Sequence, residues 1–117
     1  MTNSIRDITE ESNCIFIIGS NTTEQHPVIG VRIRAAKRRR GAKLIVADPR
    51  RIDIADYADL YLQHEPGTDI ALLNGLMHII IREGWHDDAF IDERTEGFEG
   101  LRETVASYTP ERTSEIT

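Results

Sequence analysis

Two short apolar runs, each closed by a polar turn, predict the first strands of a parallel sheet. The first run covers Cys14–Ile18 and stops at Gly19, and the second covers Lys43–Ala47 and stops at Asp48. Because the first run does not alternate with polar residues, it is typical of a strand buried on both faces. A weaker third strand is predicted at Leu60–Leu62.

A helix is predicted between the first two strands, over Pro27–Arg40. Proline suits a first helical position, and Gly41 suits the left-handed stop that commonly ends a helix. An apolar stripe is expected along this helix at Val28, Val31, Ile33, Ala35 and Ala36. Such a stripe indicates the side of a helix that packs on a core.

A longer helix is predicted after the third strand. It begins at Thr68 or Asp69, either of which can serve as the cap, and it ends near Glu83, with Gly84 as its stop. Its residues are apolar nearly all round, which predicts a deeply buried helix.

The rest of the chain predicts short helices over residues 87–94 and 98–107. Thr109-Pro110-Glu111 is typical of the opening of a further helix, and the chain stops soon afterwards, so we expect a piece excised from a longer polypeptide. The order of strands and crossovers predicts an α/β fold whose open parallel sheet has sequential strands as neighbours. A length of 117 residues fits a single domain over residues 1–117.

The net charge limits which kinds of molecule the chain can bind, and the cysteine content indicates its cellular compartment. The formal net charge of −6 disfavours nucleic acid and anionic membranes, because both attract basic surfaces. The basic run Arg38–Arg40 predicts a solvated helix end rather than a nucleic-acid site. The single cysteine, Cys14, excludes an internal disulfide, favours a reducing and hence cytoplasmic compartment, and is expected in the core.

Polar loops follow the predicted strands at the edge where parallel sheets bind ligands. These loops are Gly19-Ser20-Asn21, Asp48-Pro49-Arg50 and Gly67-Thr68-Asp69. Glycine lets backbone N–H groups approach an anion, and the helix that starts at Pro27 adds a positive dipole end. An acidic residue after the second strand suits ribose hydroxyls. The three loops together indicate a nucleotide-like ligand.

Each loop also has a purely structural explanation. Gly19-Ser20-Asn21 fits a plain turn, Asp48-Pro49 fits a strand terminator, and Asp69 fits a helix cap. His78 and Asn74, four residues apart on the long helix, fit hydrogen-bonded interior residues rather than a site. The sequence contains no GxGxxG, P-loop or HExxH motif, so the common enzyme signatures do not assign a reaction.

Several segments taken together resemble one protein family. In chain order they are MTNSIRDI, CIFIIGSNTTEQHPVIG, AKLIVADPRR, IADYADLYLQ, PGTDIALLNGLMHIII and ERTEGFEGLRETVASYTPE. They are similar to an internal segment of the catalytic alpha subunit of molybdenum or tungsten formate dehydrogenases. These enzymes belong to the molybdopterin oxidoreductase superfamily, which is related to dimethyl sulfoxide reductase. The resemblance covers essentially the whole chain, and the joint occurrence of GSN…HP, DPRR, PGTD and RTEGFE is specific.

The resemblance implies a Rossmann-like α/β domain, an open parallel sheet with flanking helices, that binds one of the two molybdopterin guanine dinucleotides of a bis-MGD cofactor. The residues expected near the phosphates and the pterin side are Gly19, Ser20, Asn21 and Glu24. Those expected near the guanosine are Asp48, Pro49 and Arg50, and those expected near the guanine are Gly67, Thr68 and Asp69.

The same resemblance assigns no catalytic residue and no metal ligand to this chain. The family's metal-binding selenocysteine or cysteine precedes the matching segment, its catalytic arginine follows it, and its iron–sulfur cysteines lie far upstream. We therefore expect the chain alone to turn over no formate. The parent enzyme is expected to oxidise formate to carbon dioxide and to pass two electrons from molybdenum or tungsten to an iron–sulfur cluster.

The partners implied are the remaining domains of the parent subunit and electron-transfer subunits, without nucleic acid or direct membrane contact. One alternative is a structural electron-transfer subunit of a respiratory complex that retains the fold without molybdenum. Another is a thiamine-enzyme central domain or a different nucleotide-binding module. The polar loops GSN, DPR and GTD disfavour the first alternative, and the ordered pair PGTD and RTEGFE disfavours the second.

Overall fold

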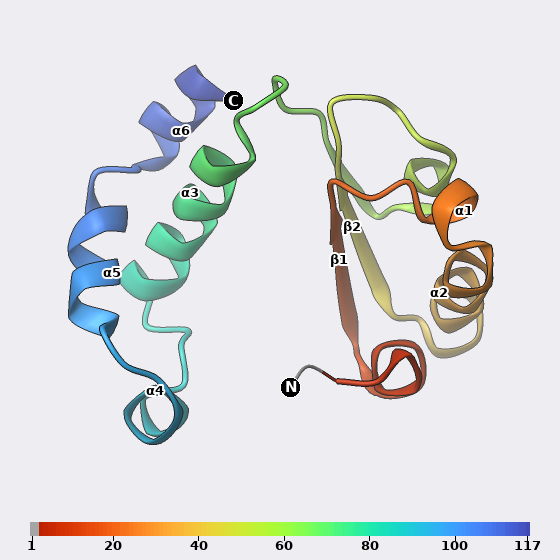
Figure 1. Ribbon diagram of the computed structural model, residues 1–117, viewed down its shortest axis with the longest axis horizontal. Helices are drawn as coiled ribbons and strands as arrows, with labels where there is room; N and C mark the ends of the chain where they lie inside the picture. Colours follow the sequence, from red (N-terminus) through yellow and green to blue (C-terminus); the bar gives the residue numbers. More distant parts are fainter. Residues whose placement is uncertain (1–2) are drawn as a thin grey trace. The chain divides into compact units, whose positions relative to one another are not determined.

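The computed structural model describes residues 3–117, so the first two residues of the predicted domain and of the MTNSIRDI segment lie outside the described residues. The chain divides into two compact units (Figure 1). The first, here called the sheet unit, ends at His64, and the second, here called the helical unit, covers Glu65–Thr117. The assignment of residues 1–117 to one cofactor-binding domain stays a prediction.

The sheet unit contains a parallel sheet and the helices that connect its strands (Figure 1). Its elements are η1 (Asp7–Glu11, a turn of π-helix), β1 (Cys14–Ile18), α1 (Thr22–Gln25), α2 (Pro27–Arg40), β2 (Lys43–Ala47), η2 (Asp53–Tyr57, a 3-10 turn) and β3 (Leu60–Leu62). The three strands and α2 begin and end at the predicted residues. Gly41 ends α2 in the left-handed conformation, at φ 70°, as its position predicted.

All strand pairs in the sheet are parallel, and the strand order is β1-β2-β3. The predicted open parallel sheet with sequential neighbours is therefore confirmed. Ile18 lies opposite Ala47, which in turn lies opposite Leu62. Because these are the last residues of their strands, the three carboxyl ends form one row, and the loops that leave β1 and β2 start side by side.

One face of the sheet carries the core of this unit. Ile15 and Ile17 of β1 and Leu44 and Val46 of β2 are buried together with Ile33 of α2. Alternate residues of a strand point to the same face, so these four strand residues share the face on which α2 packs.

The other face of β1 is exposed, which corrects the prediction of a strand buried on both faces. Cys14 is exposed, and Phe16 is 38% exposed. Within the sheet unit, α2 packs on the opposite face, so the continuous apolar run has only one covered side. The prediction that Cys14 is a core residue is wrong for the same reason.

Helix α2 packs through a different stripe from the one predicted. Gly30, Ile33 and Ala36 are buried, whereas Val28 and Val31 are 67% and 55% exposed. Successive residues of a helix are rotated by about 100°, so the two valines lie on the side away from Ile33. The predicted stripe therefore combined two faces of the helix.

The helical unit consists of α3 (Asp69–Arg82), α4 (Asp88–Arg94), α5 (Phe98–Ala106) and α6 (Pro110–Ile116). Helix α3 contacts α5 and α6, and the His78 Nδ1 atom lies 3.1 Å from the Val105 carbonyl oxygen. Gly75 packs so closely on α6 that an added Cβ would come within 2.5–2.9 Å of the Thr113 side chain.

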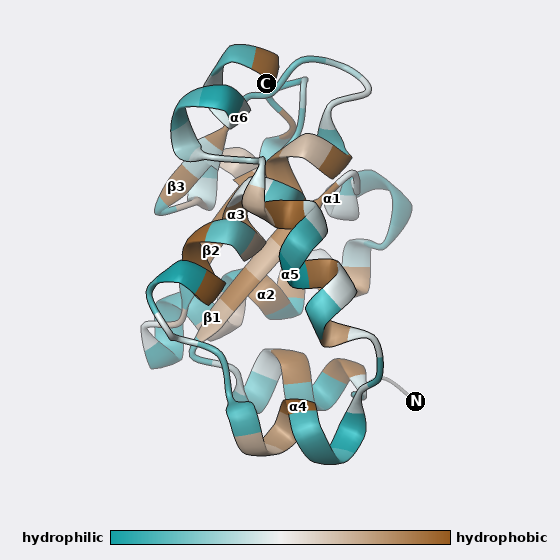
Figure 2. Cartoon of the chain, turned by 90° about the vertical axis from the view of Figure 1, so that its left-hand side faces the viewer, coloured by the Kyte–Doolittle hydropathy of each residue, from teal (hydrophilic) through white to brown (hydrophobic). Residues whose placement is uncertain are grey.

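Helix α3 is not deeply buried, contrary to its predicted environment. Gly75 is its buried residue, while Ile70 is 73% and Ile80 41% exposed. Figure 2 shows apolar segments along the helices of this unit. A helix that is apolar all round needs neighbours on all sides, and α5 and α6 cover only part of it. Across residues 3–117, no helix combines the length and the apolar character required to span a membrane.

Candidate functional site

The loop after β1 starts with a glycine in the left-handed conformation. Gly19 has φ 62°, which side chains other than glycine rarely adopt, and an added Cβ would meet open space. Its N–H donates to the Ala47 carbonyl over 3.4 Å, so the contact with β2 continues to the start of the loop. The chain then turns into α1, where the Thr22 N–H donates to the Ser20 carbonyl over 2.9 Å.

Three side-chain oxygens at the end of this loop and the start of α1 are buried without a hydrogen-bond partner among residues 3–117. They are Asn21 Oδ1, Thr22 Oγ1 and Thr23 Oγ1. Thr22 as a whole is only 7% exposed. Buried polar atoms in folded proteins nearly always have a partner, because leaving one unpaired costs about 1–3 kcal/mol. The three oxygens therefore indicate a polar group supplied from outside the described residues.

The amino end of α2 lies next to this loop. Its N-cap residue, His26, makes no side-chain cap hydrogen bond, and Pro27 occupies the first turn. Gly30 lets α2 approach α1 closely, since a Cβ there would lie 3.3 Å from the Thr22 carbonyl oxygen. The positive end of the dipole of this 14-residue helix is thus held beside the loop, where it favours an anion.

The loop after β2 holds a carboxylate in a fixed position. Asp48 is 8% exposed, and its Oδ1 atom accepts a hydrogen bond from the Arg50 N–H over 2.8 Å. The Asp48 carbonyl accepts from the Tyr61 hydroxyl over 2.8 Å, and the Pro49 carbonyl accepts from Gln63 Nε2 over 3.0 Å. Both contacts from the β3 side anchor the loop.

Charged side chains remain available at these two loops. The Arg50 side chain and the Glu24 side chain are exposed, and neither makes an ion pair within the described part of the chain. Arg50 therefore presents a cation beyond the end of β2, where a phosphate or a ribose hydroxyl can be bound. Glu24, on α1, presents a hydrogen-bond acceptor beside the first loop.

The third predicted loop belongs to the helical unit. Gly67 adopts φ 85°, and the Thr68 hydroxyl donates to the Glu65 carbonyl over 2.7 Å. Of the two residues predicted as the cap of α3, Thr68 holds the N-cap position, and Asp69 is the first helical residue. A carboxylate in the first turn is favoured by the helix dipole, so the structure retains a local role for Asp69 beside any role toward a ligand.

The structure brings two of the three predicted residue sets to one edge of the sheet. Gly19-Ser20-Asn21 and Asp48-Pro49-Arg50 leave neighbouring parallel strands at opposite positions of the register. The grouping of Gly67-Thr68-Asp69 with them stays a prediction. Sequence reasoning missed Thr22 and Thr23, although the unbroken polar run SNTT after Gly19 was a visible signal.

The described residues offer no cluster suited to a metal ion: among residues 3–117, no three His, Cys, Asp or Glu side chains are grouped for that purpose. Cys14 is the first residue of β1, and Gly19 follows the last. The thiol therefore lies at the opposite end of the strand from the loops. What the loops present is a set of hydroxyl, amide and carboxylate groups with one guanidinium, which suits a phosphorylated ligand.

Comparisons with known proteins agree on one family. The sequence model of the family described as Molybdopterin oxidoreductase matches residues 1–108. The chain is 54% identical over 116 residues to the F420-dependent formate dehydrogenase 1 subunit alpha of Methanococcus maripaludis, a match that covers 99% of this chain and 17% of that protein. It is 44% identical over 117 residues to formate dehydrogenase H of Escherichia coli, covering 100% of this chain and 16% of that protein.

The fold matches a solved structure as well. Acetylene hydratase from Pelobacter acetylenicus superposes with a TM-score of 0.84 at 40% sequence identity, over 93% of this chain and 15% of that one. This match supports the Rossmann-like α/β assignment. The chain thus spans 16–17% of the length of the two formate dehydrogenase relatives.

Proposed function

Because the chain belongs to the molybdopterin oxidoreductase family, we propose that it holds a molybdopterin guanine dinucleotide within the alpha subunit of a cytoplasmic formate dehydrogenase. The parent oxidises formate to carbon dioxide, so the substrate loses one proton and two electrons. Molybdenum or tungsten in the bound cofactor supplies this redox chemistry, with an iron–sulfur cluster elsewhere in the parent as the next acceptor. This chain contributes orientation, because a fixed nucleotide end fixes the position of the metal.

One observation carries the proposal: three oxygens beside Gly19 are buried without a partner in residues 3–117. The hydroxyls of Thr22 and Thr23 can donate to phosphate oxygens, and Asn21 Oδ1 can accept from an N–H of the pterin side. The adjacent positive end of α2 adds to the attraction for phosphate. The groups present therefore fit a phosphorylated pterin nucleotide.

The remaining predicted residues receive roles toward the nucleoside end. One carboxylate oxygen of Asp48 accepts a hydrogen bond from the Arg50 N–H. The other carboxylate oxygen accepts from a ribose hydroxyl. The Arg50 guanidinium neutralises phosphate charge. A carboxylate at Asp69 can accept from the adjacent N1–H and N2–H₂ donors of guanine, a donor pair that adenine lacks.

The relatives that carry formate dehydrogenase in their names favour formate as the substrate of the parent. The molybdenum-free alternative, a structural electron-transfer subunit, gives the hydroxyls of Thr22 and Thr23 no function. Such a subunit would be more stable with apolar residues at both positions, since unpaired buried hydroxyls are costly.

The experiment that tests the proposal is Thr22→Val in the full-length alpha subunit. Valine keeps the shape of threonine and removes only the hydroxyl. We expect the cofactor-depleted subunit to melt at the same or a higher temperature, because an unpaired polar group is removed. Affinity for the cofactor should fall about 10- to 150-fold, the loss expected for a hydrogen bond to a charged group. Guanine nucleotide released by acid treatment reports the bound cofactor.

Thr9→Val is the matched control. Thr9 is 6% exposed, but its hydroxyl donates to the Ile5 carbonyl over 2.9 Å. This control should lower the melting temperature and leave cofactor affinity unchanged. Full cofactor affinity in Thr22→Val, or an equal loss of affinity in both variants, would contradict the proposed role of the loop.

A further inference from the structure

The solvent-facing side of α2 carries an apolar stripe bounded by arginines. The centre of the stripe contains Val28 and Val31, which are 67% and 55% exposed, followed by Ala35. A rotation of about 100° per residue places Arg32 and Arg39 along one border and Arg38 at the carboxyl end. We call these six residues the outer face of α2.

The arginines of the outer face differ from most other basic residues of the chain. Arg32, Arg38 and Arg39 make no hydrogen bond, ion pair or ring contact among residues 3–117. Elsewhere, basic side chains pair with neighbouring carboxylates, as in Arg6–Glu10, Lys37–Asp59, Arg51–Asp56, Arg82–Glu83 and Arg102–Glu99. Glu10 lines a hollow together with Arg32 and Arg39, but its carboxylate pairs with Arg6 instead.

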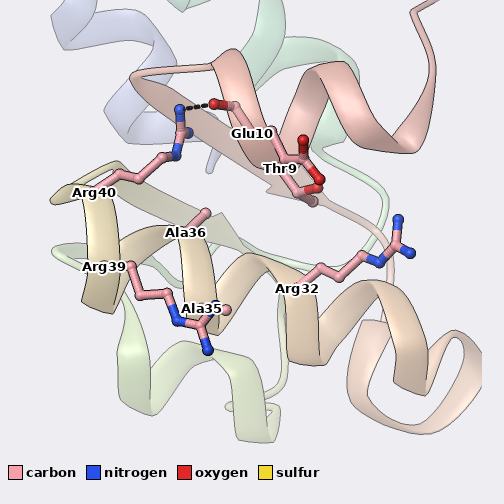
Figure 3. Close-up of a pocket in the computed structure, with 7 residues that line it drawn as sticks. All are labelled: Thr9, Glu10, Arg32, Ala35, Ala36, Arg39 and Arg40. Atoms are coloured by element: carbon pink, nitrogen blue, oxygen red, sulfur yellow. Dashed lines mark hydrogen bonds between the residues drawn. The ribbon is translucent and has the colours of Figure 1, made fainter.

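Arg40, which follows Arg39 on the same helix, does have hydrogen-bond partners. Arg40 donates to the main-chain carbonyls of Glu10 and Ser12 and so ties α2 to the η1 segment. Figure 3 shows its contact with Glu10, while Arg32 and Arg39 extend from the helix without a marked contact. Basic side chains without a partner among residues 3–117 are therefore a feature of the outer face and not of α2 as a whole.

Two hollows lie along the outer face, and Val31 lines both of them. A hollow of about 610 Å³ is lined by Val31, Arg34, Arg38 and Tyr57 among others. A second, almost wholly apolar hollow is formed by Pro27, Val28, Val31 and Arg32. The first hollow is lined mainly by basic side chains and the second by apolar ones. An apolar pit bordered by arginines is typical of protein interfaces, in which arginine is enriched.

From this arrangement we propose that the outer face of α2 docks a separate acidic protein. Its contact segment carries aliphatic side chains that fill the apolar hollow at Val28 and Val31 and carboxylates that meet Arg32, Arg38 and Arg39. The apolar centre disfavours nucleic acid, whose contacts are mainly phosphates met by basic side chains. The inference does not depend on the proposed cofactor.

A partner that arrives by diffusion gains from this charge cluster in a way that a covering segment of the parent does not. A segment that the parent chain already holds in place gains only the ion pairs that it forms, because it needs no steering toward the surface. For a separate protein, the same cluster steers encounter and raises the association rate. In a chain with a net charge of −6, a local basic surface also orients an acidic partner.

The test uses the full-length alpha subunit and a fluorescent helical peptide of about 20 residues, roughly the length that spans 30 Å. The peptide has an isoleucine stripe flanked by glutamates, and a scrambled peptide of equal composition is the control probe. Replacing Arg32, Arg38 and Arg39 together by Glu should weaken binding more than about tenfold. Replacing the same residues by Gln should weaken it less, and Val28→Ser with Val31→Ser should also weaken it.

The matched control reverses three paired arginines of the helical unit, Arg82, Arg94 and Arg102, which changes the net charge equally. It should leave peptide binding near the unmodified value. A second measurement is arginine modification by phenylglyoxal, in which Arg32, Arg38 and Arg39 should react in the alpha subunit alone and be protected by the peptide.

Four results would overturn the proposal. These are no preference for the designed peptide over the scrambled one, equal losses in the outer-face and control variants, tighter binding of an oligothymidylate of similar charge, and protection of the three arginines in the subunit alone. The last result would show that the parent chain itself covers this face.

Discussion

The sheet unit and the helical unit differ in how they bury apolar side chains. Among residues 3–117, eleven of the twelve buried hydrophobic residues lie in the sheet unit, and Val105 is the one in the helical unit. The helical unit leaves Ile70, Trp85 and Phe90 at 73%, 71% and 59% exposure. The two units have similar lengths, so the difference comes from architecture and not from size.

This difference shows which unit closes a hydrophobic core from its own residues. A parallel sheet with α2 on one face closes a core of its own, and the loops of the candidate site are attached to that core. The helical unit has the composition of a buried segment without enough neighbours to bury it. We therefore expect protein outside residues 3–117 to complete the helical unit, whereas the loops after β1 and β2 are positioned locally.

The largest expected effect is Leu44→Ala in the sheet unit. Leu44 is 1% exposed, and truncating a buried leucine costs about 2–5 kcal/mol in the free energy of unfolding. Leu101→Ala in the helical unit is the comparison, because Leu101 is already 39% exposed. Amide hydrogen exchange of peptides from β1 and β2 should accelerate strongly in the first variant. Similar acceleration in Leu101→Ala would remove the distinction between the units.

A smaller effect is expected for Gly75→Ala in the helical unit. The new Cβ would lie 2.5 Å from Thr113 Oγ1, and overpacking of this kind costs about 1–3 kcal/mol. Exchange should accelerate in α3 and α6 and remain unchanged in the sheet unit. Gly100→Ala is the matched control, since a Cβ in α5 meets nothing within 4 Å. That control should be stabilising by about 0.5–1 kcal/mol. Unchanged exchange in Gly75→Ala would show that α6 is free to move away.

The smallest effect concerns the ion pair that joins α2 to the sheet. The pKa of Asp59 is lowered because Lys37 hydrogen-bonds its carboxylate and the Leu44 N–H donates to it. A carboxyl group whose pKa is lower in the folded state stabilises the fold at every pH above its ordinary pKa of 3.8. This contribution is lost as the pH falls through the folded-state pKa. Asp59→Asn should therefore slightly lower the melting temperature at pH 7.

The same variant should also flatten the loss of stability below about pH 4. Lys37→Met should reproduce part of both changes, because it removes the first cause of the shift. A melting curve for Asp59→Asn that falls with acid as steeply as that of the unmodified protein would exclude this role.

The strands and α2 could be predicted to the residue because their signals are local. Pro27 opens α2 and Gly41 closes it, and β2 stops where Asp48-Pro49 begins. Burial could not be predicted in the same way, because it depends on which surfaces other elements cover. Cys14, Val28 and helix α3 were therefore assigned to the wrong environments.

The position of the candidate site could be predicted from the sequence, but the burial of its side chains could not. The two loops after β1 and β2 could be placed because both strands end at recognisable residues, and parallel pairing brings their ends together. The buried hydroxyls of Thr22 and Thr23 could not be predicted, since their burial depends on α1 lying against α2. A four-residue helix gives no periodic signal from which this contact could be read.

Calorimetry of nucleotide binding to the full-length alpha subunit tests most directly whether these loops and Asp69 hold a guanine dinucleotide. Asp69→Asn keeps the size of the side chain and replaces one acceptor by a donor that faces a donor of guanine. Guanosine diphosphate binding should weaken about 10- to 150-fold, while adenosine diphosphate binding should change little. Unchanged affinity with an unchanged preference for guanine over adenine would contradict this role and would leave Asp69 as a first-turn residue of α3.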